Sequence, residues 1–133
     1  GHQTMQIHQS AEDYLETILM LTQRMGKVRS IDVVNELGYT KASVSIAMKK
    51  LRENGYIAVD GEGNLTLLEP GREIAERIYS RHRLLTHFFI QLGVDKDIAA
   101  EDACKAEHIL SEQTLEKIRE YALLHDAEAS NQD

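Results

Sequence analysis

Residues 30–55, SIDVVNELGYTKASVSIAMKKLRENG, contain two apolar patterns of helical spacing, one on each side of Gly38. The apolar positions of the two patterns are Ile31, Val34 and Leu37, followed by Val44, Met48 and Leu51. Ser30 is suited to cap the first helix, and Asn54-Gly55 closes the second. Because a tight turn with a glycine joins two short helices, the pattern predicts a helix-turn-helix.

The apolar period becomes extended after Gly55, in residues 56–59 and 64–68. A turn at residues 60–63, DGEG, separates these two runs, and the combination predicts a β-hairpin. A helix-turn-helix that is followed directly by a hairpin has the element order of a winged helix. A small α+β fold without a nucleic-acid role has the same pattern, so the pattern alone leaves that alternative open.

Amphipathic helices are expected on both sides of this winged segment. The expected helices are residues 10–25 with Ser10 as cap, 70–92 with Pro70 in the first turn, 95–110 after Asp95, and a last helix from Ser111 to about His125. The fold class is therefore mainly α with a small β-hairpin. We expect a winged-helix domain over 5–70, a helical domain over 71–126 and a flexible polar tail over 127–133.

The second half of the chain is expected to associate with a second copy. Its helical faces are few, and one is rich in small residues, namely Ala99, Ala103 and Ala106. A partner subunit is the simplest way to bury such faces, so a homodimer is predicted.

Composition limits the classes of function. The 133 residues carry a net charge of -7, which argues against a protein that coats nucleic acid without selectivity. Residues 39–52, however, contain four basic residues and no acidic one. The single cysteine, the lack of a 20-residue apolar run and the lack of a signal-peptide pattern indicate a cytoplasmic protein.

Polar and basic residues of the helix-turn-helix are candidates for contact with double-stranded DNA. The second helix of such a motif enters the major groove with its N-terminal residues facing bases and phosphates. The candidate DNA-binding residues are Arg29, Thr40, Lys41, Ser43, Ser45, Lys49 and Lys50. For each residue alone, a helix cap or a solvated side chain is an equally good interpretation.

Residues 104–108, CKAEH, bring three metal-ligand types together if they are helical. Cys104 would lie one turn before both Glu107 and His108, so that thiolate, carboxylate and imidazole share one side. Asp13 and Glu16 share a face of the first expected helix, although acids in a first turn are also common as caps.

Four motifs in this order resemble the diphtheria toxin repressor family of metal-dependent transcriptional regulators. They are SAEDYLE at 10–16, SRHRLL at 80–85, GVD at 93–95 and CKAEHILS at 104–111. The length of the chain resembles the two-domain manganese transport regulator branch. The resemblance implies a winged-helix domain, a helical dimerisation domain and a site for divalent metal.

The resemblance also implies a ligand set. Asp13 and Glu16 match the first-helix ligands of the manganese branch, His82 matches a ligand shared with the iron branch, and Glu107 and His108 match the later pair. Cys104 departs from the manganese pattern and matches the iron-sensing branch, whereas His87 matches no ligand. Oxygen donors favour Mn(II), the thiolate favours Fe(II), and Co(II) or Zn(II) are expected to bind in vitro.

These features together predict a metal-activated transcriptional repressor. It would bind a palindromic operator as a dimer and control metal-ion uptake, with Mn(II) favoured as its cofactor and with no enzymatic activity. An Fe(II)-responsive repressor of the same family and a winged-helix regulator that senses an organic ligand are the alternatives. A metal-dependent hydrolase with Glu107 or Glu16 as base lacks a nucleophile motif and a phosphate-binding loop.

Overall fold

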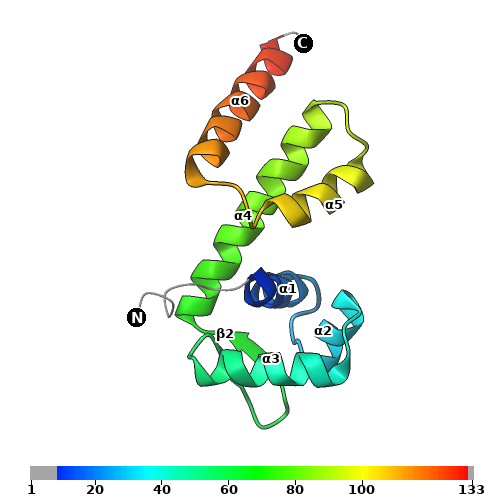
Figure 1. Cartoon of the computed structure of the whole chain (residues 1–133), viewed down its shortest axis with the longest axis vertical. Coiled ribbons are helices and arrows are strands. Elements are labelled where there is room, and N and C mark those ends of the chain that lie inside the picture. Colours follow the sequence, from blue (N-terminus) through cyan, green and yellow to red (C-terminus); the bar gives the residue numbers. More distant parts are fainter. Residues whose placement is uncertain (1–8, 132–133) are drawn as a thin grey trace. The chain divides into compact units, whose positions relative to one another are not determined.

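A computed structural model of the chain describes residues 9–131, and it is mainly helical with one two-stranded antiparallel sheet (Figure 1). Its elements are α1 (Gln9–Met25), α2 (Ser30–Leu37), α3 (Lys41–Glu53), β1 (Ile57–Val59), β2 (Leu65–Leu67), α4 (Glu69–Gln91), α5 (Lys96–Ala106) and α6 (Glu112–Asn131). The predicted fold class is confirmed. The chain forms two compact units that divide within α4, between Arg77 and Ile78, and we call them the N-terminal and the C-terminal unit.

The core of the N-terminal unit is formed by α1, α2, α3 and the hairpin. Leu15, Ile18, Val33, Val44 and Ile57 are almost completely buried in it. Each short helix or strand has only one face to bury. On α2 that face contains Val33, whereas Ile31, which the helical pattern placed on the apolar face, is 44% exposed. The helix-turn-helix is therefore fixed on α1 by burial of apolar surface.

Caps at the turn between α2 and α3 explain why the two helices end and begin there. Gly38 ends α2 with a positive φ of 72°, a conformation that costs glycine little, and its N–H donates to the Val34 carbonyl over 2.8 Å. The Thr40 hydroxyl then accepts a hydrogen bond from the Ser43 N–H over 3.1 Å at the start of α3. This turn directs α3 away from the line of α2.

The predicted helix caps at Ser10 and Ser30 are wrong. Ser10 already lies within α1, and the cap of α2 is Arg29, one residue before Ser30. The Arg29 N–H donates to the Asp32 carboxylate over 2.9 Å, so that an acid at the third helical position satisfies the N–H of the cap residue.

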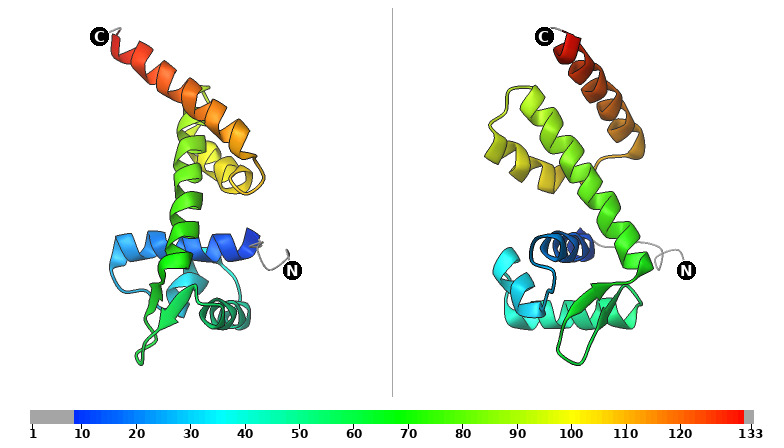
Figure 2. Two further views of the ribbon diagram at one scale, coloured as in Figure 1. Left: turned by 90° about the vertical axis from the view of Figure 1, so that its left-hand side faces the viewer. Right: turned by 180° about the vertical axis from the view of Figure 1, so that it is seen from behind.

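The predicted hairpin is present and extends from the C-terminal end of α3 (Figure 2). Ile57 pairs with Leu67 and Val59 pairs with Leu65 across the two strands. Ile57, Leu65 and Leu67 are buried, whereas Thr66 between the last two is exposed, so one face of the hairpin packs on the core.

The first turn of α4 packs closely against the start of the hairpin. Gly71 is buried there, and a Cβ atom at its position would lie 2.2 Å from the Tyr56 carbonyl oxygen. The same carbonyl accepts a hydrogen bond from the Leu68 N–H over 3.0 Å. Only glycine allows the backbone of α4 to approach the hairpin so closely, which explains why the first two turns of α4 belong to the N-terminal unit.

The C-terminal unit has a separate core of Leu85, Ala103 and Leu115, one residue from each of α4, α5 and α6. Ala99 and Ala103 are completely buried in the single chain, and Ala103 packs with Leu85 and Leu115. The small-residue face of α5 therefore packs inside the subunit, which corrects the expectation that a partner covers it.

The last two helices differ in length from their predicted extents. The fifth was expected to continue to Leu110, but α5 ends at Ala106, and residues 107–109 form a turn. The sixth was expected to end near His125, but α6 continues to Asn131. A tilted ring contact between His125 and Tyr121, with ring centres 4.4 Å apart, and a distance of 3.7 Å from His125 Nδ1 to the Glu128 carboxylate support the additional turn.

Candidate functional site

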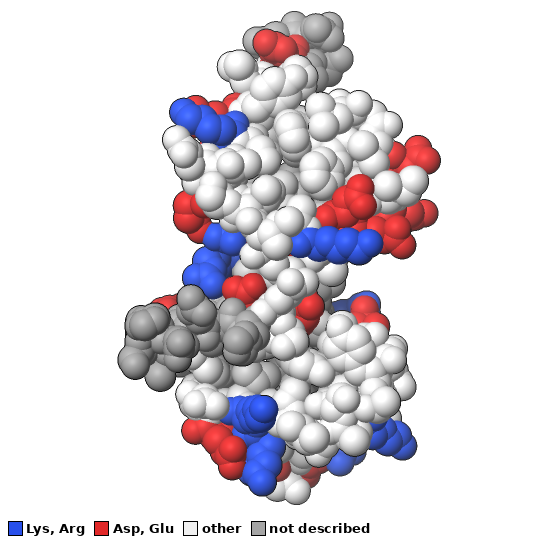
Figure 3. All heavy atoms as spheres, viewed as in Figure 1, with Lys and Arg blue, Asp and Glu red and all other residues white. Residues whose placement is uncertain are grey.

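The candidate DNA-contacting residues of α3 lie on its exposed side. Val44, Met48 and Leu51 are buried against the unit, and the polar and basic residues face outward. The exposed residues of the predicted set are Thr40, Lys41, Ser43, Ser45, Lys49 and Lys50. Figure 3 shows Lys and Arg side chains over the region where Figure 1 places α3. The helix thus offers donors and positive charge, which phosphates and base edges require.

Arg29, the remaining residue of this set, lies beside the hairpin turn. It forms an isolated antiparallel bridge with Asn64, and its guanidinium is 3.5 Å from the place where a Cβ of Gly63 would be. Gly63 has a φ of 86°, so the turn depends on glycine at this position. Arg29 is therefore exposed next to the hairpin turn at residues 60–64, which we call the wing.

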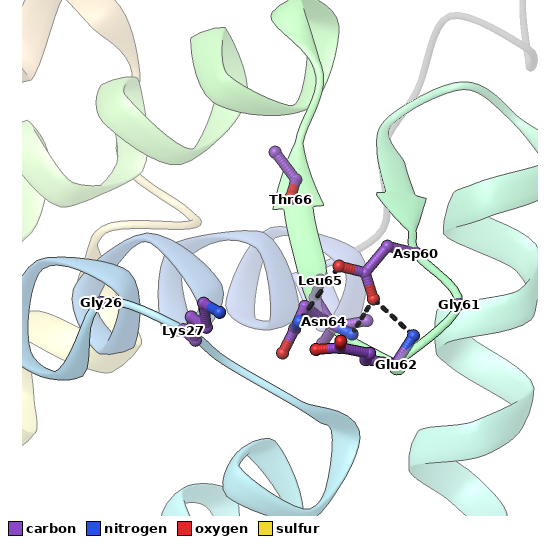
Figure 4. A pocket seen from close by; sticks show the side chains of 8 residues that line it. All are labelled: Gly26, Lys27, Asp60, Gly61, Glu62, Asn64, Leu65 and Thr66. Carbon is purple, nitrogen blue, oxygen red and sulfur yellow. Dashed lines mark hydrogen bonds between the residues drawn. The ribbon is translucent and has the colours of Figure 1, made fainter.

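The hairpin turn is held by the carboxylate of Asp60 (Figure 4). Its two oxygens accept hydrogen bonds from the backbone N–H groups of Glu62 and Asn64, both over 2.9 Å, and from the Asn64 amide over 3.0 Å. The side-chain hydrogen bond from Asn64, followed by the backbone one, lowers the pKa of Asp60. Asp60 thus fixes the conformation of the wing, and the N–H groups of the turn stabilise its negative charge.

A buried carboxylate with two imidazoles forms the chemical centre of the C-terminal unit. Glu107 is completely buried at the C-cap of α5. Its Oε2 lies 3.0 Å from His82 Nδ1, and its Oε1 lies 3.5 Å from His108 Nε2. Among residues 9–131, no hydrogen bond reaches Oε1 of Glu107. A buried carboxylate oxygen that accepts no hydrogen bond is costly unless positive charge is supplied nearby.

The single cysteine, Cys104, approaches the same carboxylate from α5. Its Sγ lies within 4.8 Å of a carboxylate oxygen of Glu107, and its side chain is exposed. The expectation that 104–108 are all helical is wrong, because α5 ends at Ala106. The Glu107 N–H nevertheless donates to the Ala103 carbonyl over 2.9 Å, and this bond keeps Glu107 one turn from Cys104.

Arg81 has a structural role at this centre that the sequence did not reveal. Its guanidinium donates to the Glu107 backbone carbonyl over 3.2 Å and pairs with the Glu112 carboxylate. It therefore ties α4 to the turn that carries Glu107 and to the start of α6. The adjacent basic and imidazole residues at 81 and 82 were a signal, but nothing in the sequence identified the carbonyl that Arg81 binds.

The other two candidate ligands, Asp13 and Glu16, belong to the N-terminal unit. They lie on one face of α1, where Asp13 is partly exposed and Glu16 is 5% exposed. Burial raises the pKa of the neighbouring Tyr14, with smaller contributions from Tyr39 and from the charge of Asp13. Two acids, one of them buried, are thus present on a helix that also carries the core of the unit.

His87 lies apart from these ligand candidates. Its Nε2 is 3.0 Å from the Asp126 carboxylate of α6, which Gln91 also contacts over 2.9 Å. It therefore joins α4 to α6 by polar contacts.

The donor types of the C-terminal unit fit a first-row divalent cation. Carboxylate oxygen and imidazole nitrogen suit Mn(II) and Fe(II), and a thiolate adds affinity for softer ions. Oε1 of Glu107, which accepts no hydrogen bond and has His108 Nε2 at 3.5 Å, is the observation that favours a cation here.

Comparison with known families matches both units of the chain. Residues 6–65 match the N-terminal DNA binding domain of the iron dependent repressors, and residues 68–124 match their metal binding and dimerisation domain. An uncharacterized helix-turn-helix transcriptional regulator of Methanocaldococcus jannaschii is 34% identical over 84% of this chain and 90% of its own length. The transcriptional regulator MntR of Escherichia coli O157:H7 is 32% identical over 87% of this chain and 75% of its own length.

Solved structures agree with these relatives. A manganese-dependent transcriptional repressor in complex with manganese has a TM-score of 0.77 and 29% identity over 84% of this chain. The manganese regulator SloR has a TM-score of 0.73 and 27% identity over the same share. The present chain spans 52% of the length of each of these two structures.

The fold and the donor cluster define a winged-helix regulator whose helical unit has the residues to hold a metal. The chain belongs to the iron-dependent repressor family, which is the diphtheria toxin repressor family that its four motifs predicted. Its function class is that of a metal-dependent transcriptional repressor. No helix among residues 9–131 is both long and apolar enough to cross a lipid bilayer.

Proposed function

We propose that this protein is a Mn(II)-activated repressor that binds a palindromic operator as a homodimer and controls metal-ion uptake. The observation that carries the proposal is the buried Glu107 carboxylate between His82 and His108, in a chain whose other unit exposes the basic helix α3. Support for manganese comes from the relatives named MntR and from the solved manganese-dependent repressor.

The proposed ligand set combines residues of both units. It consists of Asp13, Glu16, His82, Cys104, Glu107 and His108. The cation would supply positive charge that offsets the carboxylates. His82 and His108 would each supply an imidazole nitrogen, and Arg81 positions Glu107 by donating to its backbone carbonyl.

Without the cation, the negative charges of Asp13, Glu16 and Glu107 would repel one another at a common site. We therefore propose that metal biases the protein toward the conformation that binds DNA. Regulation then requires only that DNA affinity differs between the two states.

Cys104 makes Fe(II) the second candidate. Its thiol lies near Glu107, and thiolate favours Fe(II), Co(II) or Zn(II) over Mn(II). Calorimetric titration of the wild type and of Cys104→Ser with Mn(II) and Fe(II) under anaerobic conditions separates the candidates. We expect the substitution to weaken Fe(II) binding more than Mn(II) binding. If the measured affinities mean that cellular concentrations load the wild type with more Fe(II) than Mn(II), iron is the physiological metal.

The homodimer is supported by large apolar side chains that the C-terminal unit leaves exposed. They are Ile90, Leu92, Ile98, Ile109, Leu123 and Leu124. Several apolar residues exposed on one small unit are typical of a surface that a partner covers. Analytical ultracentrifugation should show a dimer at micromolar concentration, and a monomer there would contradict the proposal.

We propose further that the protein acts in the cytoplasm, where its DNA target is, and that it has no catalytic residue.

The central test of metal activation is selection of DNA by the full chain from a pool of random duplexes, with Mn(II) or with EDTA. A two-fold symmetric sequence should be enriched only with Mn(II). Equal enrichment with EDTA would remove metal activation from the proposal.

A further inference from the structure

Ile46 is an exposed branched apolar residue in the middle of the helix that is expected to read DNA. Its relative exposure is 59%, whereas Val44 and Met48 on the same helix are almost completely buried. An isolated exposed apolar residue on a surface needs no explanation. The position of this one on α3 does call for an explanation.

Helix geometry places Ile46 at the centre of the outward face. Successive residues turn by about 100°, so Ile46 lies roughly 200° around the helix axis from Val44, which points into the core. Ala42, one turn earlier on the same side, is exposed as well. The face of α3 that is farthest from the core is therefore an apolar strip of Ala42 and Ile46.

Cations flank this apolar strip. Lys49 and Lys50 are exposed on α3 next to Ile46. A groove of about 350 Å³ is lined by Ile46 together with Lys49, Arg52 and Val59 of β1. An apolar strip with a cationic border is complementary to a DNA major groove, in which phosphates surround base edges and thymine presents a methyl group.

We propose that Ile46 contacts the 5-methyl group of a thymine in the major groove and thereby makes operator recognition depend on that thymine. This inference rests on the proposed function, because it requires α3 to enter the major groove. Among the bases of DNA, only thymine offers an apolar group in that groove. The cations beside Ile46 bind phosphates of any sequence, so the isoleucine adds selectivity that they cannot provide.

The test replaces single thymines by deoxyuridine, which removes only the methyl group. The DNA is the duplex that the Mn(II)-loaded full chain selects from a random pool, and the readout is fluorescence anisotropy. Burial of one methyl group corresponds to about fourfold in affinity. We expect one thymine per half-site whose replacement weakens wild-type binding by about fourfold, and by about fifteenfold when both half-sites are replaced.

Ile46→Ala should lose about the same fifteenfold on the thymine duplex and should no longer distinguish thymine from deoxyuridine. Ile31→Ala is the matched control, because Ile31 is 44% exposed on α2 of the same unit. It should bind both duplexes as the wild type does. Circular dichroism is expected to show the same folded state for both variants, since each loses an exposed side chain.

Two results overturn the inference. If the wild type binds selected DNA but is indifferent to every deoxyuridine, or if Ile46→Ala remains as sensitive to the methyl group as the wild type, Ile46 does not read thymine. If no sequence is selected with Mn(II), the proposed function fails at the first step, and the inference fails with it. The two failures are therefore distinguished by the stage at which they occur.

Discussion

Replacement of Gly71 by alanine should destabilise the N-terminal unit through a single steric contact. The added Cβ would lie 2.2 Å from the Tyr56 carbonyl oxygen, 3.0 Å from the Tyr56 carbonyl carbon and 3.3 Å from Leu15 Cδ2. The nearest group is backbone, so it cannot turn aside as the end of a flexible side chain could. Either α4 or the start of the hairpin has to move.

The expected magnitude follows from three contributions. Overpacking in a core costs about 1–3 kcal/mol. Displacement of the Tyr56 carbonyl also breaks its hydrogen bond from the Leu68 N–H, which contributes about 1 kcal/mol. Alanine is a better helix former than glycine by about 1 kcal/mol, which acts in the opposite direction. The free energy of unfolding should therefore fall by about 1–3 kcal/mol.

Urea unfolding followed by circular dichroism measures this difference. EDTA is present so that bound metal does not contribute to the measured stability. Gly61→Ala is the matched control, since a Cβ there meets nothing within 4 Å. Its stability should equal that of the wild type within about 0.5 kcal/mol, or exceed it slightly. If Gly71→Ala is as stable as Gly61→Ala, the close approach of α4 to the hairpin is not a real constraint, and the explanation given for the course of α4 is wrong.

Three further predictions concern the site, the DNA surface and the wing. Glu107→Gln keeps the size of a buried side chain but removes its charge, so calorimetry should show the Mn(II) affinity lowered by more than about tenfold. Glu101→Gln, at an exposed position, should leave the Mn(II) affinity unchanged. Equal affinities of the two variants would exclude Glu107 as a ligand. Lys49→Ala should weaken binding to all DNA sequences and reduce the salt slope by about one, and an unchanged slope would mean that Lys49 contacts no phosphate. The pKa of Asp60 is lowered below its usual 3.8, so its carboxylate stabilises the folded wing above that pH, and this stabilisation is lost as the pH falls through the lower pKa of the folded state. Titration of the folded protein by NMR should therefore give a midpoint for Asp60 below 3.8, and a midpoint above it would contradict the hydrogen bonds of the turn.

Apolar periodicity was sufficient to predict the helices of the N-terminal unit and the hairpin. Val44, Met48 and Leu51 recur at helical spacing because one face of α3 must be buried, and the structure buries all three. Cap positions were less well predicted. Serine and acid side chains both accept hydrogen bonds from helix N-termini, and Asp32 rather than Ser30 does so at the start of α2.

The C-terminal unit was harder to predict because its contacts join residues far apart in the sequence. Ala99 and Ala103 have the composition of an interface, yet both are completely buried within one subunit. The early end of α5 likewise depends on tertiary structure, since Arg81 binds the Glu107 carbonyl from a residue 26 positions earlier. No local pattern contains that information.

The ligand candidates were identified by residue type and family resemblance, and the structure adds the environment of Glu107. The motif at 104–108 was interpreted as part of one helix, although Glu107 and His108 follow its end. Complete burial of a carboxylate is not visible in the sequence, because acids at helix ends are usually solvated. Ile46 was not singled out in the sequence, because it is not one of the residues that recur at helical spacing there.

The dependence of DNA affinity on metal is the central claim, and the affinity ratio between Mn(II) and EDTA tests it most directly. Fluorescence anisotropy on the selected duplex should give an affinity at least about tenfold higher with Mn(II) for the wild type, within the usual range of coupling between two sites. The ratio should approach one for Glu107→Gln and stay at the wild-type value for Glu101→Gln. Equal wild-type affinity with Mn(II) and with EDTA would contradict the account.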